Sequence, residues 1–301
     1  MTTTRYPIYF CVKVLLLFIS KEGFSQNKLN LNHFTKNRIL STFEVSYKSK
    51  PRENLNEGSI KMNIQSSSTH YLQLKQYIFK ADAKRGGVVV ESQINRIKSE
   101  TDNGMTQGIY DSENVFERGT DPAAVLLANR YDPIIKKPLK VIYNADGIAL
   151  DTIVKPALPS GNSSIILSNV RNWSYLFIHV PEDFVWKEGK EWNDSLLVEN
   201  ILVKAQYKVI SIQNGIASLD VKGVNSPQKT FSLRSQPVKI KEESTQSDSN
   251  FSGKTIVNIQ NNMILEFEFN LNKEVSFDAM GQKMYLINEQ TMTVKNQLVK
   301  D

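Results

Sequence analysis

The chain has 301 residues, of which 37 are Lys or Arg and 31 are Asp or Glu, so its formal net charge is +6. This small excess is typical of an ordinary solvated surface and disfavours nucleic-acid binding, which concentrates basic residues on one face. A single cysteine, Cys11, excludes a disulfide framework within the chain.

Residues 1–25 have the layout of a secretory signal peptide. A basic start at Arg5 precedes a short apolar run over 14–19, and Ser25 is a small residue at the expected cut. The run is too short to span a bilayer, which takes about 20 residues. A retained N-terminal anchor is the alternative, because Lys21 lies close to the cut. Removal of this segment would leave an exported chain without cysteine, which favours a bacterial envelope protein in the periplasm or outside the cell.

The next segments predict an antiparallel meander. Apolar and polar residues alternate over 41–50, in a second and a third run within 58–83, and once more over 88–100. A period of two residues is typical of a half-buried strand, and Gly86-Gly87 predicts the turn before the last of these runs.

The pattern changes near residue 120. Asp121 is a suitable N-cap and Pro122 suits the first helical position, so a helix of about two turns is expected before Pro133. A hairpin follows, with Asp146-Gly147 supplying the positive φ of its turn.

Proline, serine and glycine cluster over 156–161 and predict a boundary between two lobes. The segment after it is ambiguous. Ile166, Val170 and Trp173 fall at helical spacing, whereas 175–180 alone would form a strand. We favour a helix that ends near Trp173 and continues into an extended segment.

The second lobe repeats the pattern of the first. A strand, a glycine turn and a second strand are expected over 207–224, and a further hairpin turns at Asn261-Asn262. The polar stretch 242–252 predicts a mobile loop.

The hairpins over 77–94 and 207–224 both open with Tyr and turn at glycine. Internal duplication explains the likeness, and chance is the alternative, since hairpins are the commonest antiparallel unit. The predicted fold is mainly β, with two related lobes of curved antiparallel sheet, half-barrel or barrel-like, over 26–155 and 156–301. One or two short helices complete it.

Several short motifs resemble a family of exported Bacteroidetes-type proteins classed as a domain of unknown function. The matching residues are Tyr110-Asp111-Ser112, Asp146-Gly147, Pro181, Gly189 with Trp192, and Tyr207 with Gly215. Lys190 and Glu191 depart from the family, which usually has Asp and a small residue there. The resemblance covers most of the mature chain and implies an envelope location and no activity.

No catalytic motif is evident. His33, His70 and His179 lie far apart and lack metal-ligand spacing, and neither a Gly-x-Ser-x-Gly elbow nor a glycine-rich phosphate loop occurs. We therefore expect a non-enzymatic protein without cofactor or metal.

Two places carry candidate contact residues. Acidic residues flank Trp186 and Trp192, and glycosidases also combine acids with aromatic rings. A glycosidase needs two carboxyl groups that face each other across the sugar, an arrangement that neighbouring residues of one turn rarely adopt. An exposed acidic turn whose tryptophans anchor strands to the core is the favoured interpretation. Tyr110 and Asp111 have a similar structural interpretation, an Asx-type turn with the tyrosine packed inward.

Three functions are compatible with these patterns. A concave sheet could bind an apolar or amphiphilic ligand such as a lipid, which we favour. A structural role that contacts an envelope protein through a sheet edge is the alternative, and an unrecognised hydrolase is the third. No transmembrane segment is expected.

Overall fold

The computed structural model describes residues 34–51, 65–80, 87–102, 104, 106–117, 122–143, 149–154, 176–181, 183–198, 201–227, 249–279 and 282–299. The signal-peptide prediction and the helix expected to end near Trp173 lie outside these residues.

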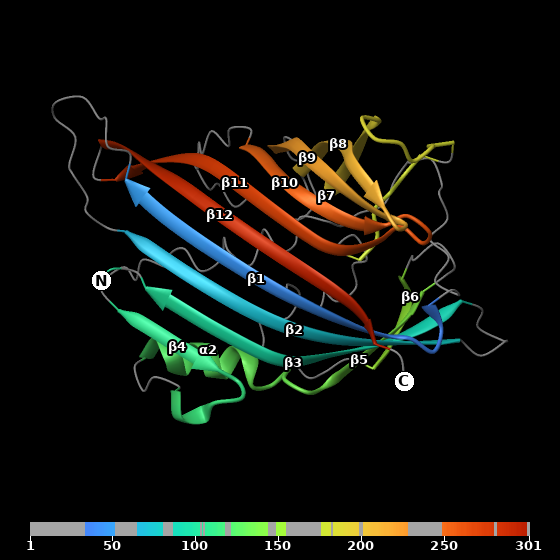
Figure 1. Cartoon of the computed structure of the whole chain (residues 1–301). Helices are drawn as coiled ribbons and strands as arrows, with labels where there is room; N and C mark the ends of the chain where they lie inside the picture. The colour runs from blue at the N-terminus through green and yellow to red at the C-terminus, as the bar shows by residue number, and fades with distance from the viewer. Residues whose placement is uncertain are drawn as a thin grey trace, which may run out of the picture.

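In the described part of the chain, twelve antiparallel strands form one curved sheet that does not close on itself (Figure 1). The strands are β1 (Arg38–Pro51), β2 (Ser66–Lys80), β3 (Val88–Asp102), β4 (Gln107–Asp111), β5 (Pro138–Tyr143), β6 (Ala149–Val154), β7 (Glu191–Val198), β8 (Ile201–Gln213), β9 (Ile216–Pro227), β10 (Ser249–Asn258), β11 (Met263–Ala279) and β12 (Gln282–Val299). The prediction of a mainly antiparallel, curved β fold is confirmed.

The order across the sheet is β6-β5-β3-β2-β1-β12-β11-β10-β9-β8-β7, and β4 extends from β3. The first strand and the last therefore pair in the middle, from Arg38 opposite Val299 to Pro51 opposite Leu286 (blue and red in Figure 1). Strands of 26–155 lie on one side of this pair, and strands of 156–301 lie on the other. The two groups share one continuous sheet, and their division into separate lobes stays a prediction.

The two hairpins that suggested duplication have equivalent registers. Tyr77 pairs with Glu91 and Tyr207 with Val221, each partner 14 residues farther along the chain. The turns differ, because β8 and β9 are joined by Asn214-Gly215 alone, with φ of 51° and 77°. Duplication itself stays a prediction.

Short segments cover the inner face, onto which most apolar side chains point. The helix α2 (Pro122–Tyr131) lies beside β4, as the Pro122 start and the Pro133 stop predicted (Figure 1). A second cover is the extended segment 176–180, in which Leu176 is buried and Phe177 forms a bridge with Met263 of β11. Within the described residues, no helix has both the length and the apolar character needed to cross a membrane.

The prediction of a mobile loop over 242–252 is wrong for its last four residues. Ser249–Ser252 belong to β10 and pair with Asn225–Lys222 of β9. The sequence there is polar because alternate side chains face solvent, while Phe251 between them is buried. Residues 242–248 lie outside the described residues. The turn at Asn261-Asn262 is confirmed, and Asn262 has a φ of 56°.

Candidate functional site

The inner face carries an open groove across β7–β10. Its volume is about 800 Å³. The described residues that line it come from four neighbouring strands and from the segment before β7: His179, Pro181, Asn193, Asp194, Lys204, Ala205, Gln206, Lys222, Gly223, Val224, Asn250, Phe251 and Ser252. A groove of this size is within the usual range of small-molecule sites.

One cross-strand row, in which each residue is paired with the next, forms the floor. Asp194 pairs with Ala205, Ala205 with Gly223, and Gly223 with Phe251. Residues directly opposite each other on paired strands lie on the same face of the sheet, so these four residues share one face. We call them the groove row.

Small side chains keep the floor of the groove low. A Cβ atom added at Gly223 would overlap the carbonyl oxygen of Lys204 and the ring of Phe251. The Phe251 ring therefore lies directly against the Gly223 backbone, and Ala205 on the other side adds only a methyl group. Glycine inside a strand often marks such a close approach.

A polar pair borders one side of the groove. His179 Nδ1 lies 3.6 Å from Asp194 Oδ1, and both side chains are partly exposed. The backbone carbonyl of His179 accepts a hydrogen bond from Trp192 Nε1 at 3.2 Å, which fixes the segment before β7 against the sheet. The groove is thus apolar over Ala205, Gly223 and Phe251 and polar at the end of the row that Asp194 forms.

An aromatic cluster of Phe184, Trp186, Trp192 and Tyr207 adjoins the polar pair. Trp192 is buried and stacks on Tyr207 with ring centroids 4.9 Å apart. Phe184 contacts Trp192 at 4.6 Å, and Trp186 meets Trp192 edge-on at 5.9 Å. Burial raises the pKa of the Tyr207 phenol, and the negative charge of Asp194 raises it further.

This chemistry suits binding of an apolar molecule. Asp194 is the only carboxylate among the described lining residues, whereas acid–base hydrolysis of a glycoside needs two. In the described part of the chain, no three His, Cys, Asp or Glu residues lie close enough together to hold a metal ion.

Comparisons with known proteins give no family. No protein-family model and no curated protein matches the chain. Among solved structures, lipovitellin, studied for its lipid–protein interactions, matches 88% of this chain with 8% identity and a TM-score of 0.49, and this chain spans 26% of it.

Two further structures match over most of their own length. Ail, the attachment invasion locus protein of Yersinia pestis in complex with the heparin analogue sucrose octasulfate, has 6% identity and a TM-score of 0.15, over 87% of this chain and all of its own. MucB in complex with MucA(peri) has 9% identity and a TM-score of 0.14, over 85% of this chain and 89% of its own. All three scores are below 0.5, so no functional argument rests on them.

The Tyr110-Asp111-Ser112 motif lies at the opposite end of the sheet from the groove and ties β4 to its neighbours. Tyr110 is fully buried, and its hydroxyl donates a hydrogen bond to Asp132 Oδ1 at 2.8 Å. The Ser112 hydroxyl accepts a hydrogen bond from the Ile97 N–H at 3.0 Å. Both contacts hold the end of β4 against β3 and the segment after α2.

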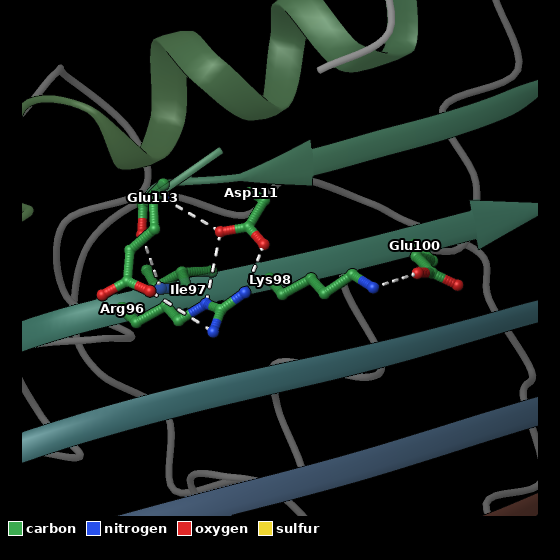
Figure 2. Close-up of polar contacts among 7 residues, drawn as sticks. Arg96, Ile97, Lys98, Glu100, Asp111 and Glu113 are labelled. Atoms are coloured by element: carbon green, nitrogen blue, oxygen red, sulfur yellow. Dashed lines mark hydrogen bonds and ion pairs between the residues drawn. The ribbon is translucent and has the colours of Figure 1, made fainter. Parts of the chain in front are cut away.

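Asp111 forms an ion pair with Arg96 of β3 (Figure 2). Arg96 Nη2 lies 2.6 Å from Asp111 Oδ2 and Arg96 Nε lies 3.3 Å from Oδ1. The N–H of Glu113 donates to Oδ1 at 2.9 Å, which is the predicted Asx turn. Glu113 Oε2 lies 3.3 Å from Arg96 Nη1 and adds a second, exposed acid to the pair.

The pKa of Asp111 is lowered by its partners. Burial alone would raise it, but the hydrogen bonds from Arg96 and from the N–H groups of Glu113 and Asn114, with the positive charge of Arg96, outweigh burial. The hydrogen bond to Asp111 likewise raises the pKa of Arg96. The motif is thus a fixed ionic contact within the sheet.

The predicted contact residues therefore occupy two separate places. Trp186 and Trp192 lie together in the aromatic cluster, as the anchoring interpretation expected, with Glu188 and Glu191 exposed beside them. Tyr110 and Trp192 stand at opposite ends of one inner-face row, roughly 40 Å apart along the sheet. That row runs Trp192, Tyr207, Val221, Gly253, Phe269, Met292, Val45, His70, Ser99, Tyr110.

Sequence reasoning missed the groove row itself. Ala205 and Phe251 carry no distinctive chemistry, and Phe251 fell within the predicted loop. Gly223, inside an otherwise regular strand, was the available signal, because glycine there weakens a strand unless another group approaches closely.

Proposed function

We propose that the protein is a non-catalytic binding module that takes the apolar part of an amphiphile, such as a lipid, into the groove, and that it works after export in the cell envelope. The observation that carries the proposal is the floor formed by Ala205, Gly223 and Phe251. Small side chains over two strands and one aromatic ring leave room for a hydrocarbon chain against a largely apolar surface. The polar pair at the edge of the groove leaves a place for a headgroup or for water.

Native mass spectrometry of protein purified from its own envelope tests the proposal directly. A lipid-sized mass that remains bound in the gas phase is expected. Protein that is repeatedly empty, together with no binding of a neutral hydrophobic dye such as N-phenyl-1-naphthylamine, would contradict it.

A variant pair locates the binding site. Ala205→Trp fills the groove, and we expect dye affinity to fall at least tenfold. Lys208→Trp introduces the same side chain on the same strand, but on the exposed outer face, and should leave dye affinity unchanged. Ala205→Leu is a smaller change that keeps the test valid if Ala205→Trp does not fold. Equal dye affinity in Ala205→Trp and Lys208→Trp would place the ligand elsewhere.

A further inference from the structure

The polar end of the groove carries a carboxylate. Asp194 begins the groove row, and its side chain, which is 22% exposed, lines the groove beside Ala205. Its other neighbours on the same face are Trp192, two residues back along β7, and Tyr207, which pairs with Trp192. None of these three side chains carries a positive charge that would offset the charge of Asp194.

The two lysines of the groove extend from the other face of the sheet. Lys204 and Lys222 each directly precede a residue of the groove row, so their side chains point to the opposite face, where both are exposed. Lys204 lines the groove with its backbone carbonyl oxygen, the atom that a Cβ at Gly223 would meet. Among the described lining residues, Asp194 therefore supplies the one permanent charge on the inner face.

His179 leaves this carboxylate able to bind a further donor. Its Nδ1 lies 3.6 Å from Asp194 Oδ1, which is longer than a hydrogen bond. A carboxylate has about four lone-pair sites, so the contact uses only part of its capacity. In a neutral imidazole the nitrogen that faces a carboxylate carries the proton, and the other nitrogen is an acceptor. Apart from that one N–H, the pair consists of acceptor atoms.

An ammonium group suits such a set of acceptors. It brings a positive charge, three donors and no acceptor, whereas a hydroxyl brings one donor and a carboxylate or phosphate brings a second negative charge next to Asp194. The floor of the groove has the length that a hydrocarbon chain needs. Three strand spacings, about 14 Å, separate Asp194 from Phe251, which is close to the length of an extended alkyl chain of ten carbons.

We infer that the groove selects an amphiphile with a cationic head, a primary ammonium group on a hydrocarbon chain. The ammonium group pairs with Asp194, and the chain lies over Ala205 and Gly223. The inference rests on the proposed function, since the chain must occupy the floor of the groove.

Displacement of N-phenyl-1-naphthylamine by three amphiphiles of equal chain length tests the inference near neutral pH. Decylamine should displace the dye at about tenfold lower concentration than 1-decanol, because a hydrogen bond between two charged groups is stronger than one from a neutral hydroxyl. Decanoate has the same charge as Asp194 and should need the highest concentration of the three.

Two variants of β7 locate the selectivity. Asp194→Asn keeps the shape of the side chain and removes its charge, so the preference for decylamine over 1-decanol should disappear. Glu191→Gln removes a carboxylate from the opposite, exposed face of the same strand and should keep the preference. The preference is a ratio between two amphiphiles on one variant, so a change in dye affinity does not affect it.

A third variant serves if Asp194→Asn does not fold. His179→Lys places a permanent positive charge beside Asp194 and should reduce the same preference. It keeps the hydrogen bond from Trp192, because that bond ends on the backbone carbonyl of His179.

The outcomes separate the two proposals. If decylamine and 1-decanol displace the dye equally, or decanoate displaces it at the lowest concentration, the inference fails and the proposed function stands. A preference for decylamine that survives in Asp194→Asn also overturns the inference, since the ammonium group must then bind elsewhere. Failure of the wild-type protein to bind the dye or any of the three amphiphiles would overturn both proposals.

Discussion

Trp192 is the residue whose removal should weaken the second half of the sheet most. Its side chain is 6% exposed and is enclosed by Phe184, Trp186 and Tyr207. A large aromatic side chain buries about 200 Å², which at about 25 cal/mol per Å² corresponds to about 5 kcal/mol. Alanine keeps part of this area, so we expect Trp192→Ala to lower the free energy of unfolding by about 4 kcal/mol.

The comparison with Trp186 makes this prediction specific. Trp186 contributes to the same aromatic cluster but is only half-buried. Trp186→Ala should therefore cost about 2 kcal/mol. Total stabilities are about 5–15 kcal/mol, so a loss of about 4 kcal/mol is large enough to measure and can unfold a marginal protein.

Urea denaturation followed by far-ultraviolet circular dichroism measures both losses. Trp192→Phe keeps an aromatic ring in contact with Tyr207 and should recover a substantial part of the stability. If Trp192→Ala unfolds within 1 kcal/mol of the wild type, the cluster does not anchor β7. Normal stability combined with lost dye binding would instead make Trp192 a ligand contact.

Two further stability predictions concern the ionic contact and the groove floor. Asp111 has a lowered pKa, so its contribution is complete above about pH 4 and is lost as the pH falls through the lowered value. The difference in unfolding free energy between wild type and Asp111→Asn should be constant near neutral pH and shrink in acid; a difference independent of pH would refute the role of the charge. Gly223→Ala should cost about 2–3 kcal/mol in urea denaturation, the upper part of the usual range for overpacking, because the new methyl group must displace Phe251 or the strand. Gly189→Ala is the control, because a Cβ atom there would meet no other atom within 4 Å. Its loss of unfolding free energy should come only from the positive φ and be about 1 kcal/mol. An equal loss at both positions would contradict the close approach at Gly223.

Much of the fold follows from local sequence. Alternation of apolar and polar residues predicted the strands, because a pleated strand buries every second side chain. Asn214-Gly215 and Asn261-Asn262 predicted turns, since these residues tolerate left-handed backbone. Pro122 and Pro133 bounded the helix α2 for equally local reasons.

Pairing between distant strands could not be predicted in the same way. Nothing in the alternation of 38–51 says that its partner lies at 286–299, because an alternating strand is compatible with many neighbours. The same difficulty applies to the candidate site. Asp111 is recognisable as a turn residue, but the β3–β4 register alone brings Arg96 to it.

The floor of the groove depends on two strand pairings at once, the β8–β9 hairpin and the pairing of β9 with β10. Ala205, Gly223 and Phe251 form its floor only because β8, β9 and β10 adopt one particular register. A shift by one residue would turn all three side chains to the opposite face.

The pairing of β1 with β12 has a consequence for biosynthesis. Arg38 and its partner Val299 are 299 − 38 = 261 positions apart, so at about 5–20 residues per second the ribosome needs roughly 10–50 s to supply the partner. Throughout that interval β1 presents unsatisfied peptide groups along one flank. The central ladder therefore cannot be completed until β12 has been synthesised, and a chaperone that shields the waiting strand would act on β1 before β12 emerges.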